Sequence, residues 1–158
     1  MRKLKLYLDT SVWNFYYADD SPEKMEVTKK FFEEIKSGKY EIYISELVFA
    51  EINRSVEEKQ NRLEGLIKEY QPFELKSDSD AEELSEKYIK ANIVPIKYKA
   101  DVIHVAFAVA NDLDVVVSWN LRHIVKLKTR LEVNGINKIE GYKEIEICTP
   151  EEVIEYDK

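Results

Sequence analysis

The side chains in this sequence that are able to do chemistry fall in a few short polar clusters next to apolar segments. The clusters are Asp9-Thr10-Ser11, the segment from Ser45 to Glu51, Asp101 inside an apolar stretch, and Ser118-Trp119-Asn120. In open parallel sheets, ligands bind beyond the carboxyl ends of the strands, so we expect these clusters to meet at one edge. Carboxylate oxygens are ligands that Mg²⁺ and Mn²⁺ prefer. Without a cation, clustered carboxylates repel one another and at least one pKa should rise.

The strands that must position these clusters are predicted from alternating or short apolar runs. Residues 3–8 alternate and end at Asp9, residues 40–44 are β-branched and aromatic, and residues 115–118 have the composition of a parallel strand buried on both faces. Residues 73–75 and 144–148 complete the predicted set, the latter as an edge strand. Asp9 is therefore expected at the carboxyl end of a strand.

Helices are expected between these strands. The predicted helices cover residues 22–37, a segment that opens at 45–46, and residues 57–70, 80–92 and 98–113, with a short final helix from 149. Strands that alternate with helices imply right-handed crossovers, so we expect an α/β fold with a mainly parallel sheet and helices on both sides. No repeat or Pro/Gly-rich linker marks a boundary, so residues 1–158 are expected to form a single domain.

The composition of the chain excludes several classes of protein. With 44% hydrophobic and 35% charged residues the chain can bury a core, and its net charge of −7 argues against a protein that coats nucleic acid through overall charge. The apolar runs fall short of the ~20 residues of a membrane span, and the N-terminus does not resemble a secretory signal. Cys148 stands alone, as a reducing compartment favours. We therefore expect a cytoplasmic protein.

The order and spacing of the motifs resemble the PIN-domain family, including the VapC-like toxins of prokaryotic toxin–antitoxin pairs. The resemblance rests on an Asp after the first strand, a Ser-x5-Glu helix, an Asp-x-x-His-x-Ala-x-Ala helix and a strand that ends in Ser-x-Asn. Each fragment alone is weak, but together they cover nearly the whole chain. The resemblance implies a three-layer α/β/α PIN-like fold and a metal-dependent endoribonuclease, in which water attacks the phosphodiester without a covalent intermediate.

The resemblance also assigns roles to individual residues. The family's metal-binding acids fall on Asp9, Glu51 and Asp101, which would hold Mg²⁺ or Mn²⁺, and its fourth acidic position falls on Asn120, which would assist catalysis. Asn120 removes one negative charge from the pattern. Toxin-like members are restrained by an antitoxin protein whose peptide occupies the cleft, and they pair as homodimers, so both partners are implied by resemblance.

Each of these polar residues also has an ordinary structural interpretation. Asp9 is suited to cap the turn that follows it, Asp101 to place a charge at a helix N-terminus, and Asn120 to form a turn. Glu46 lies nearer the helix start than Glu51 and competes with it for the site role. These alternatives stay open at the level of sequence.

Several neighbours of these residues are candidates for supporting roles. Thr10, Ser11 and Ser118 are expected to hydrogen-bond the metal-binding carboxylates, with capping as the alternative. His104 shares a helix face with Asp101, where it either titrates or hydrogen-bonds near the site, or is a satisfied core histidine.

Two further groups are candidates for contacting RNA. A stretch without acids contains Arg122, Lys126, Lys128 and Arg130, and it is expected either to hold the RNA backbone or to form a solvated helix face. Dense aromatics follow Asp9, and they form either a wall for stacked bases, a dimer contact or part of the core: Trp13, Phe15, Tyr16 and Tyr17.

Two rival functions belong to other classes. A PIN-fold RNA- or protein-binding module with weak catalysis is suggested by Asn120 and the acidic net charge. A phosphatase-like or nucleotide-binding domain with Asp9 as nucleophile would ordinarily have an Asp-x-Asp pair, but position 11 is Ser and the few glycines form no phosphate-binding loop.

Overall fold

A computed structural model describes residues 2–156 of the chain. Within them lies a five-stranded sheet in the order β3-β2-β1-β4-β5, in which every neighbouring pair is parallel. The strands are β1 (Leu4–Leu8), β2 (Tyr40–Ser45), β3 (Phe73–Leu75), β4 (Val115–Val117) and β5 (Glu146–Cys148). The predicted strands and the parallel sheet are confirmed, and β5 is an edge strand as predicted.

The order of the strands creates a crevice at the centre of the sheet. From β1 the chain moves outward to β2 and β3, and it then returns to place β4 on the other side of β1, with β5 beyond it. The connections that follow β1 and β4 therefore lead in opposite directions along the sheet. A crevice remains between them beyond the carboxyl ends of β1 and β4, and ligands of such sheets bind in this crevice.

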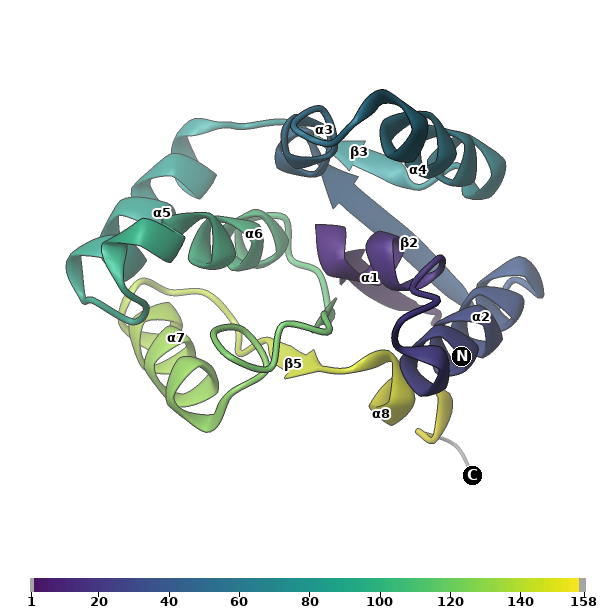
Figure 1. Cartoon of the computed structure of the whole chain (residues 1–158). Coiled ribbons are helices and arrows are strands. Elements are labelled where there is room, and N and C mark those ends of the chain that lie inside the picture. The colour runs from purple at the N-terminus through teal and green to yellow at the C-terminus, as the bar shows by residue number, and fades with distance from the viewer. Residues whose placement is uncertain (1, 157–158) are drawn as a thin grey trace.

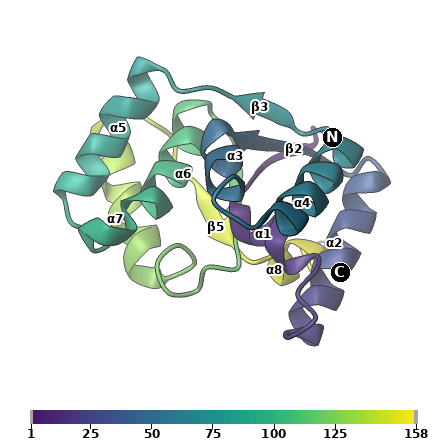
Figure 2. The same ribbon diagram turned by 45° about the horizontal axis from the view of Figure 1, so that its top comes forward.

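Helices cover both faces of the sheet (Figures 1 and 2). One apolar cluster joins the sheet to α1 (Thr10–Phe15), α2 (Pro22–Lys36), α3 (Glu46–Ile52), α4 (Glu57–Tyr70) and α8 (Pro150–Ile154). The other joins it to α5 (Ser79–Lys90), α6 (Lys99–Ala110) and α7 (Leu127–Ile139). The predicted three-layer α/β/α arrangement is confirmed.

Side-chain alternation explains why β4 is apolar throughout and β1 is apolar at every position except Lys5. Leu6 and Leu8 of β1 belong to the cluster beneath α2, whereas Tyr7 belongs to the cluster beneath α6. The three valines of β4 divide between the two clusters in the same way. Successive side chains of a strand point to opposite faces, so a strand covered on both sides needs apolar residues at every position.

The helix boundaries follow local signals. α8 begins with a capping box between Thr149 and Glu152, as the sequence predicts. α6 ends at Ala110 rather than at residue 113, and Asp112 just beyond it has a positive φ of 60°, which a helix cannot contain.

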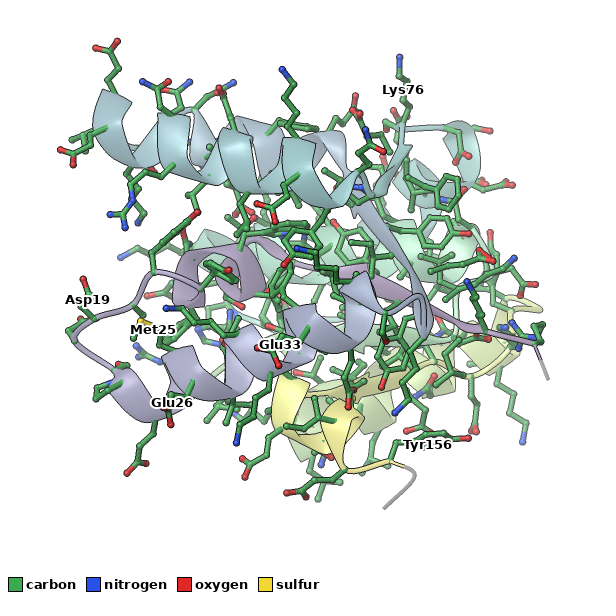
Figure 3. The ribbon with its side chains drawn as sticks, turned by 90° about the vertical axis from the view of Figure 1, so that its right-hand side faces the viewer. Asp19, Met25, Glu26, Glu33, Lys76 and Tyr156 are labelled. Carbon is green, nitrogen blue, oxygen red and sulfur yellow. The ribbon has the colours of Figure 1, made fainter. Side chains whose placement is uncertain are left out.

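Figure 3 shows the outer side of α2, from which Glu26 and Glu33 project away from the sheet. Among residues 2–156, no helix combines the length and the apolar character needed to cross a bilayer.

Two helices were not predicted from the sequence, α1 and α7. α1 has only six residues, too few to show a helical period. α7 buries Thr129, Val133 and Asn137, whereas its Leu127 and Leu131 are exposed. A helix whose buried face is mostly polar does not display the usual hydrophobic pattern.

Candidate active site

A small pocket of about 250 Å³ opens beyond the carboxyl ends of the strands. It is lined by Asp9, Thr10, Ser11, Asn14, Glu51, Ser55, Asp101, His104 and Asn120. These residues come from four separate parts of the chain, namely the end of β1 with α1, the region of α3, α6 and the loop after β4. The structure thus brings together all four residues that the sequence predicts to be catalytic.

Asp9 connects the segment after β1 to the loop after β4 at the central crevice. Its Oδ1 accepts a hydrogen bond from Ser11 Oγ at 2.6 Å, and its Oδ2 accepts one from Ser118 Oγ at 2.7 Å. These hydroxyls are held in turn by backbone donors, Trp119 N to Ser11 and Asn120 N to Ser118, both at 2.9 Å. The Asp9 side chain makes no capping hydrogen bond to α1 among the described residues, so the capping alternative is wrong. Burial raises its pKa despite the nearby His104 and the two serine hydroxyls.

Asp101 lies in the first turn of α6 and points into the same pocket. Burial raises its pKa to about 6, although the charge of His104 and a hydrogen bond from Asn120 act in the opposite direction. Its Oδ2 is buried and has no hydrogen-bond partner anywhere in residues 2–156. A buried carboxylate oxygen without a partner is costly, so the position calls for a ligand that the chain itself does not supply.

Glu51, in the last turn of α3, is held through one of its two oxygens. Thr10 Oγ1 donates to Oε1 at 2.5 Å, and His104 Nε2 lies 2.6 Å from the same atom. Burial raises the pKa of Glu51, but the interactions with His104 and Thr10 outweigh it, so that the net pKa lies below its ordinary value. The competing Glu46 is turned elsewhere, since its Oε1 accepts from Ser77 N at 3.0 Å. The geometry therefore favours Glu51 over Glu46 as the residue facing the pocket.

His104 satisfies both interpretations that the sequence left open. It is almost completely buried, as a core histidine would be, and both ring nitrogens have partners, Nδ1 with Tyr7 Oη at 2.6 Å and Nε2 with Glu51. Burial lowers its pKa, whereas the hydrogen bond and charge of Glu51 raise it, with a net increase. Tyr7 Oη also lies 2.7 Å from Ser45 Oγ, so a buried polar chain leads from the sheet to the pocket.

Asn120 combines a turn contact with a place in the pocket. Its Oδ1 accepts from His123 N at 2.9 Å, the arrangement of a turn-forming Asn, and its side chain also lines the pocket beside Asp101. The two interpretations of this residue are thus compatible.

The donor set fits a divalent cation chemically. Three carboxylates and an amide provide the hard oxygens that Mg²⁺ and Mn²⁺ prefer, and Asp101 offers an oxygen without a partner. Within residues 2–156, however, no three acidic, His or Cys side chains are arranged closely enough to hold an ion as they stand. Side chains of such sites often tighten only when ligands bind, so small rotations are needed to form the site.

The four basic residues proposed to contact RNA point in different directions. Arg122 and Lys126 are exposed on the loop after Asn120, which itself lines the pocket. Lys128 instead donates to the carbonyl oxygen of Ile93 at 3.0 Å, and Arg130 lines a different pocket with Glu144. Arg122 and Lys126 are therefore the better placed pair for a substrate that reaches the site.

The aromatic residues after Asp9 divide between the core and the surface. Trp13 is fully buried, with its ring centroid 5.2 Å from that of Phe32, so it is a core residue. Tyr16 also packs on Phe32. Phe15 and Tyr17 line a larger pocket of about 490 Å³ that shares Asn14 with the candidate site.

Three residues of the site were missed by sequence reasoning. Asn14 and Ser55 line the pocket, and Tyr7 holds His104 from below. Asn14 follows Thr10 by four residues, a spacing that places the two on one face of α1, but α1 itself was not predicted. Nothing in the sequence marks Tyr7 as different from its apolar neighbours in β1.

Comparison with known proteins identifies similar folds. The family model described as the PIN domain matches residues 6–125. A crystal structure of VapBC2 from Rickettsia felis, bound to a DNA fragment from its promoter, aligns with a TM-score of 0.54 and 12% identity, covering 92% of this chain and 98% of that one. DNA-bound VapBC from Salmonella typhimurium aligns with a TM-score of 0.54 and 16% identity, covering 93% and 98%. No curated protein matches the chain.

Proposed function

Because the chain belongs to the PIN-domain family, whose members are generally nucleases, we propose that it is a metal-dependent endoribonuclease that hydrolyses RNA phosphodiester bonds. The observation that carries the proposal is the pocket in which Asp9, Glu51 and Asp101 meet, with an oxygen of Asp101 that has no partner among the described residues. A phosphodiester brings further negative charge to these acids, so a cation must accompany it.

In this proposal Asp9, Glu51 and Asp101 hold Mg²⁺ or Mn²⁺, with Asn120 beside them. When bound, such an ion positions and acidifies a water molecule and stabilises the charge that grows on the scissile phosphate. The chain's own part is to fix the ligands. Ser11 and Ser118 hold both oxygens of Asp9, whereas Thr10 and His104 hold one oxygen of Glu51.

The RNA backbone is proposed to run along the loop after β4. Arg122 and Lys126 are exposed there and provide a local positive charge on an otherwise acidic protein. Contacts with phosphates position a nucleic acid without reading its sequence, so this pair would set affinity rather than base preference. Lys128 and Arg130 stay candidates of lower rank, because Lys128 donates to the carbonyl oxygen of Ile93 and Arg130 lines a different pocket.

Partners are proposed from the same comparison. The two similar structures are VapBC complexes bound to DNA, and we extend from them the proposal that this chain is the toxin of a type II pair, held by an antitoxin protein and paired as a homodimer in the cytoplasm. Co-expression with a small DNA-binding protein encoded by a neighbouring gene, followed by co-purification, tests the antitoxin. Sedimentation of the purified chain tests the homodimer.

The proposed reaction is tested with purified protein and a mixed pool of RNAs. Cleavage is expected with Mg²⁺ or Mn²⁺, and it should stop with EDTA and return when the metal is restored. Asp101→Asn should abolish cleavage while the protein remains folded, as circular dichroism would show. Cleavage that persists in EDTA would contradict the metal-dependent mechanism.

A binding module is the second candidate, favoured by Asn120 and by the absence among residues 2–156 of a metal-holding group in the present arrangement. In that case wild type and Asp9→Asn would both leave the RNA pool intact but bind it with equal affinity. A gel-shift measurement beside the cleavage assay separates the two functions.

A further inference from the structure

A buried chain of hydrogen bonds runs from the middle of the sheet to Glu51. Ser45 Oγ lies 2.7 Å from Tyr7 Oη, Tyr7 Oη lies 2.6 Å from His104 Nδ1, and His104 Nε2 lies 2.6 Å from Glu51 Oε1. These four residues belong to β2, β1, α6 and α3 in turn. Ser45, Tyr7 and His104 are at most 2% exposed, whereas the Glu51 side chain is 25% exposed at the pocket.

The Glu51 carboxylate fixes which atom is the donor at the pocket end of this series of hydrogen bonds. An ionised carboxylate only accepts, so His104 Nε2 must carry a hydrogen and donate it to Glu51. When the ring carries that hydrogen alone, Nδ1 accepts from the Tyr7 hydroxyl, which accepts from Ser45. The Ser45 oxygen accepts in turn from Leu47 N at 3.2 Å. In this neutral tautomer each donor has one acceptor, and a flipped imidazole ring would leave buried groups unpaired.

The two donors to Glu51 reach the same oxygen. Thr10 Oγ1 from α1 and His104 Nε2 from α6 both contact Oε1, and no hydrogen bond to Oε2 is found among residues 2–156. Donors from two different helices fix the plane of the carboxylate. A free Glu side chain would otherwise lose rotamer freedom whenever it took up a ligand.

We propose that Ser45, Tyr7 and His104 are positioning residues that hold Glu51 Oε1 so that Oε2 is presented to a divalent cation. The inference deepens the proposed function and rests on it, since its consequence is the affinity of the site for Mn²⁺ or Mg²⁺. Tyr7 lines no part of the pocket and acts only through His104. Partners that orient a metal ligand in this way typically change metal affinity or activity about 10–100-fold when they are removed.

A second buried tyrosine offers a matched control. Tyr88 of α5 is as completely buried as Tyr7 and belongs to the same apolar cluster, but its hydroxyl donates to Asn137 of α7 rather than toward the pocket. Tyr7→Phe and Tyr88→Phe each remove one buried hydroxyl, which takes away the acceptor of the Ser45 hydroxyl and the donor to His104 Nδ1 in the first variant and the donor to Asn137 Oδ1 in the second. Both variants should lose stability, but only Tyr7→Phe should affect Glu51.

The test compares Mn²⁺ binding by calorimetry in full-length wild type, Tyr7→Phe and Tyr88→Phe, in the absence of RNA. We expect Tyr7→Phe to weaken Mn²⁺ binding about tenfold, and Tyr88→Phe to leave it unchanged. In cleavage assays, the Mn²⁺ concentration that gives half the maximal rate should rise in Tyr7→Phe, while KM for RNA stays the same. Thermal unfolding of the metal-free variants shows whether their losses of stability match.

Substitutions at His104 add a rescue measurement. His104→Gln keeps an N–H donor on the side chain, whereas His104→Leu has none, so Gln should retain more of the Mn²⁺ affinity than Leu. If Gln and Leu lower the affinity equally, the donated hydrogen bond is not what positions Glu51.

The other outcomes each have one meaning. Equal Mn²⁺ affinity in wild type and Tyr7→Phe overturns the inference while the proposed function stands. An equal loss in Tyr7→Phe and Tyr88→Phe also overturns it, because a general loss of stability would then explain both. Wild-type protein that neither binds Mn²⁺ nor cleaves RNA overturns the proposed function and the inference with it.

Discussion

Asp114 at one end of the sheet and Asp9 and Asp101 at the other have opposite kinds of surroundings. Asp114, just before β4, accepts from both Arg2 Nη1 and Nη2 at 2.9 and 3.0 Å and from Lys5 N at 2.8 Å, with Lys143 Nζ at 3.1 Å. Burial raises its pKa, but these partners outweigh it, so its net pKa lies far below the ordinary value. The chain supplies every positive charge that this carboxylate needs, which makes Asp114 a structural residue.

At the carboxyl edge, Asp9 and Asp101 receive no such compensation. Asp9 is met by hydroxyls rather than by an ammonium or guanidinium group, and one oxygen of Asp101 has no partner among residues 2–156. Burial raises the pKa of both residues. A buried acid and a half-buried one that form no ion pair with a basic side chain among the described residues are best explained by a cation that arrives from outside. The contrast with Asp114 distinguishes a site from a structural ion pair.

The largest expected effect is on the rate of RNA cleavage, which should depend on Asp9 and not on Asp114. Asp9→Asn should reduce the cleavage rate at least about 100-fold, because it removes a charge that the proposed cation requires. Asp114→Asn should leave the rate within about twofold, since Asp114 lies outside the pocket. Initial rates on one RNA substrate at a fixed Mn²⁺ concentration compare them. If both variants lost cleavage activity to a similar extent, the distinction between a site residue and a structural residue would be wrong.

Asp114→Asn should lower stability although it leaves activity almost unchanged. Asp114→Asn should lower the free energy of unfolding by about 1 kcal/mol at neutral pH, a value reduced because Arg2 is largely exposed. A depressed pKa means that this stabilisation is present above the unfolded-state pKa of about 3.9 and is lost as pH falls through the folded-state value. Denaturant unfolding at several pH values measures the difference, and a constant gap down to low pH would contradict the assignment.

Substitution of Asp101 should change the free energy of unfolding in the opposite direction to substitution of Asp114. Its folded-state pKa of about 6 lies above the unfolded-state value, so the free energy of unfolding of the metal-free protein falls as pH rises from about 4 to about 6, and the loss is complete above that. Asp101→Asn should therefore raise the free energy of unfolding by about 1 kcal/mol at neutral pH, after allowance for partial exposure, and by nothing below about pH 4. Unfolding in EDTA gives the comparison. A destabilised Asp101→Asn at neutral pH would mean that Asp101 is a structural residue like Asp114.

The smallest expected effect concerns the basic loop beside the site. Arg122→Ala should raise KM for RNA a few-fold and reduce the slope of log affinity against log salt by about 1, as the loss of one phosphate contact predicts. Lys128→Ala provides the control, because its side chain is bound to the backbone after α5. Equal salt slopes in wild type and Arg122→Ala would place the RNA elsewhere.

Much of the fold was predictable because its signals are local. The strands are alternating or short apolar runs, and α4 and α8 carry clear amphipathic or capping patterns, so their positions were predicted nearly to the residue. α7 was missed because its buried face contains Thr129 and Asn137, whose polar groups are satisfied by His123 O in the preceding loop and by the Tyr88 hydroxyl of α5. Sequence periodicity reports apolar burial and not buried polar contacts.

The site was predictable only in part for a related reason. The order of the motifs indicated Asp9, Glu51, Asp101 and Asn120, and the structure brings all four to one pocket. The link from Tyr7 through His104 to Glu51 joins positions on three separate elements, and no spacing in the sequence reveals it. The directions of Lys128 and Arg130 likewise depend on how α7 packs.

The direct test of metal binding at this pocket is a crystal structure of the protein soaked in Mn²⁺, with the ion located by its anomalous scattering. We expect a peak in the pocket at about 2.1 Å from a carboxylate oxygen of Asp9 and from Oδ2 of Asp101, with Glu51 Oε2 turned toward it. A pocket without an ion at saturating Mn²⁺, or an ion bound only by residues elsewhere on the surface, would contradict metal binding at this pocket.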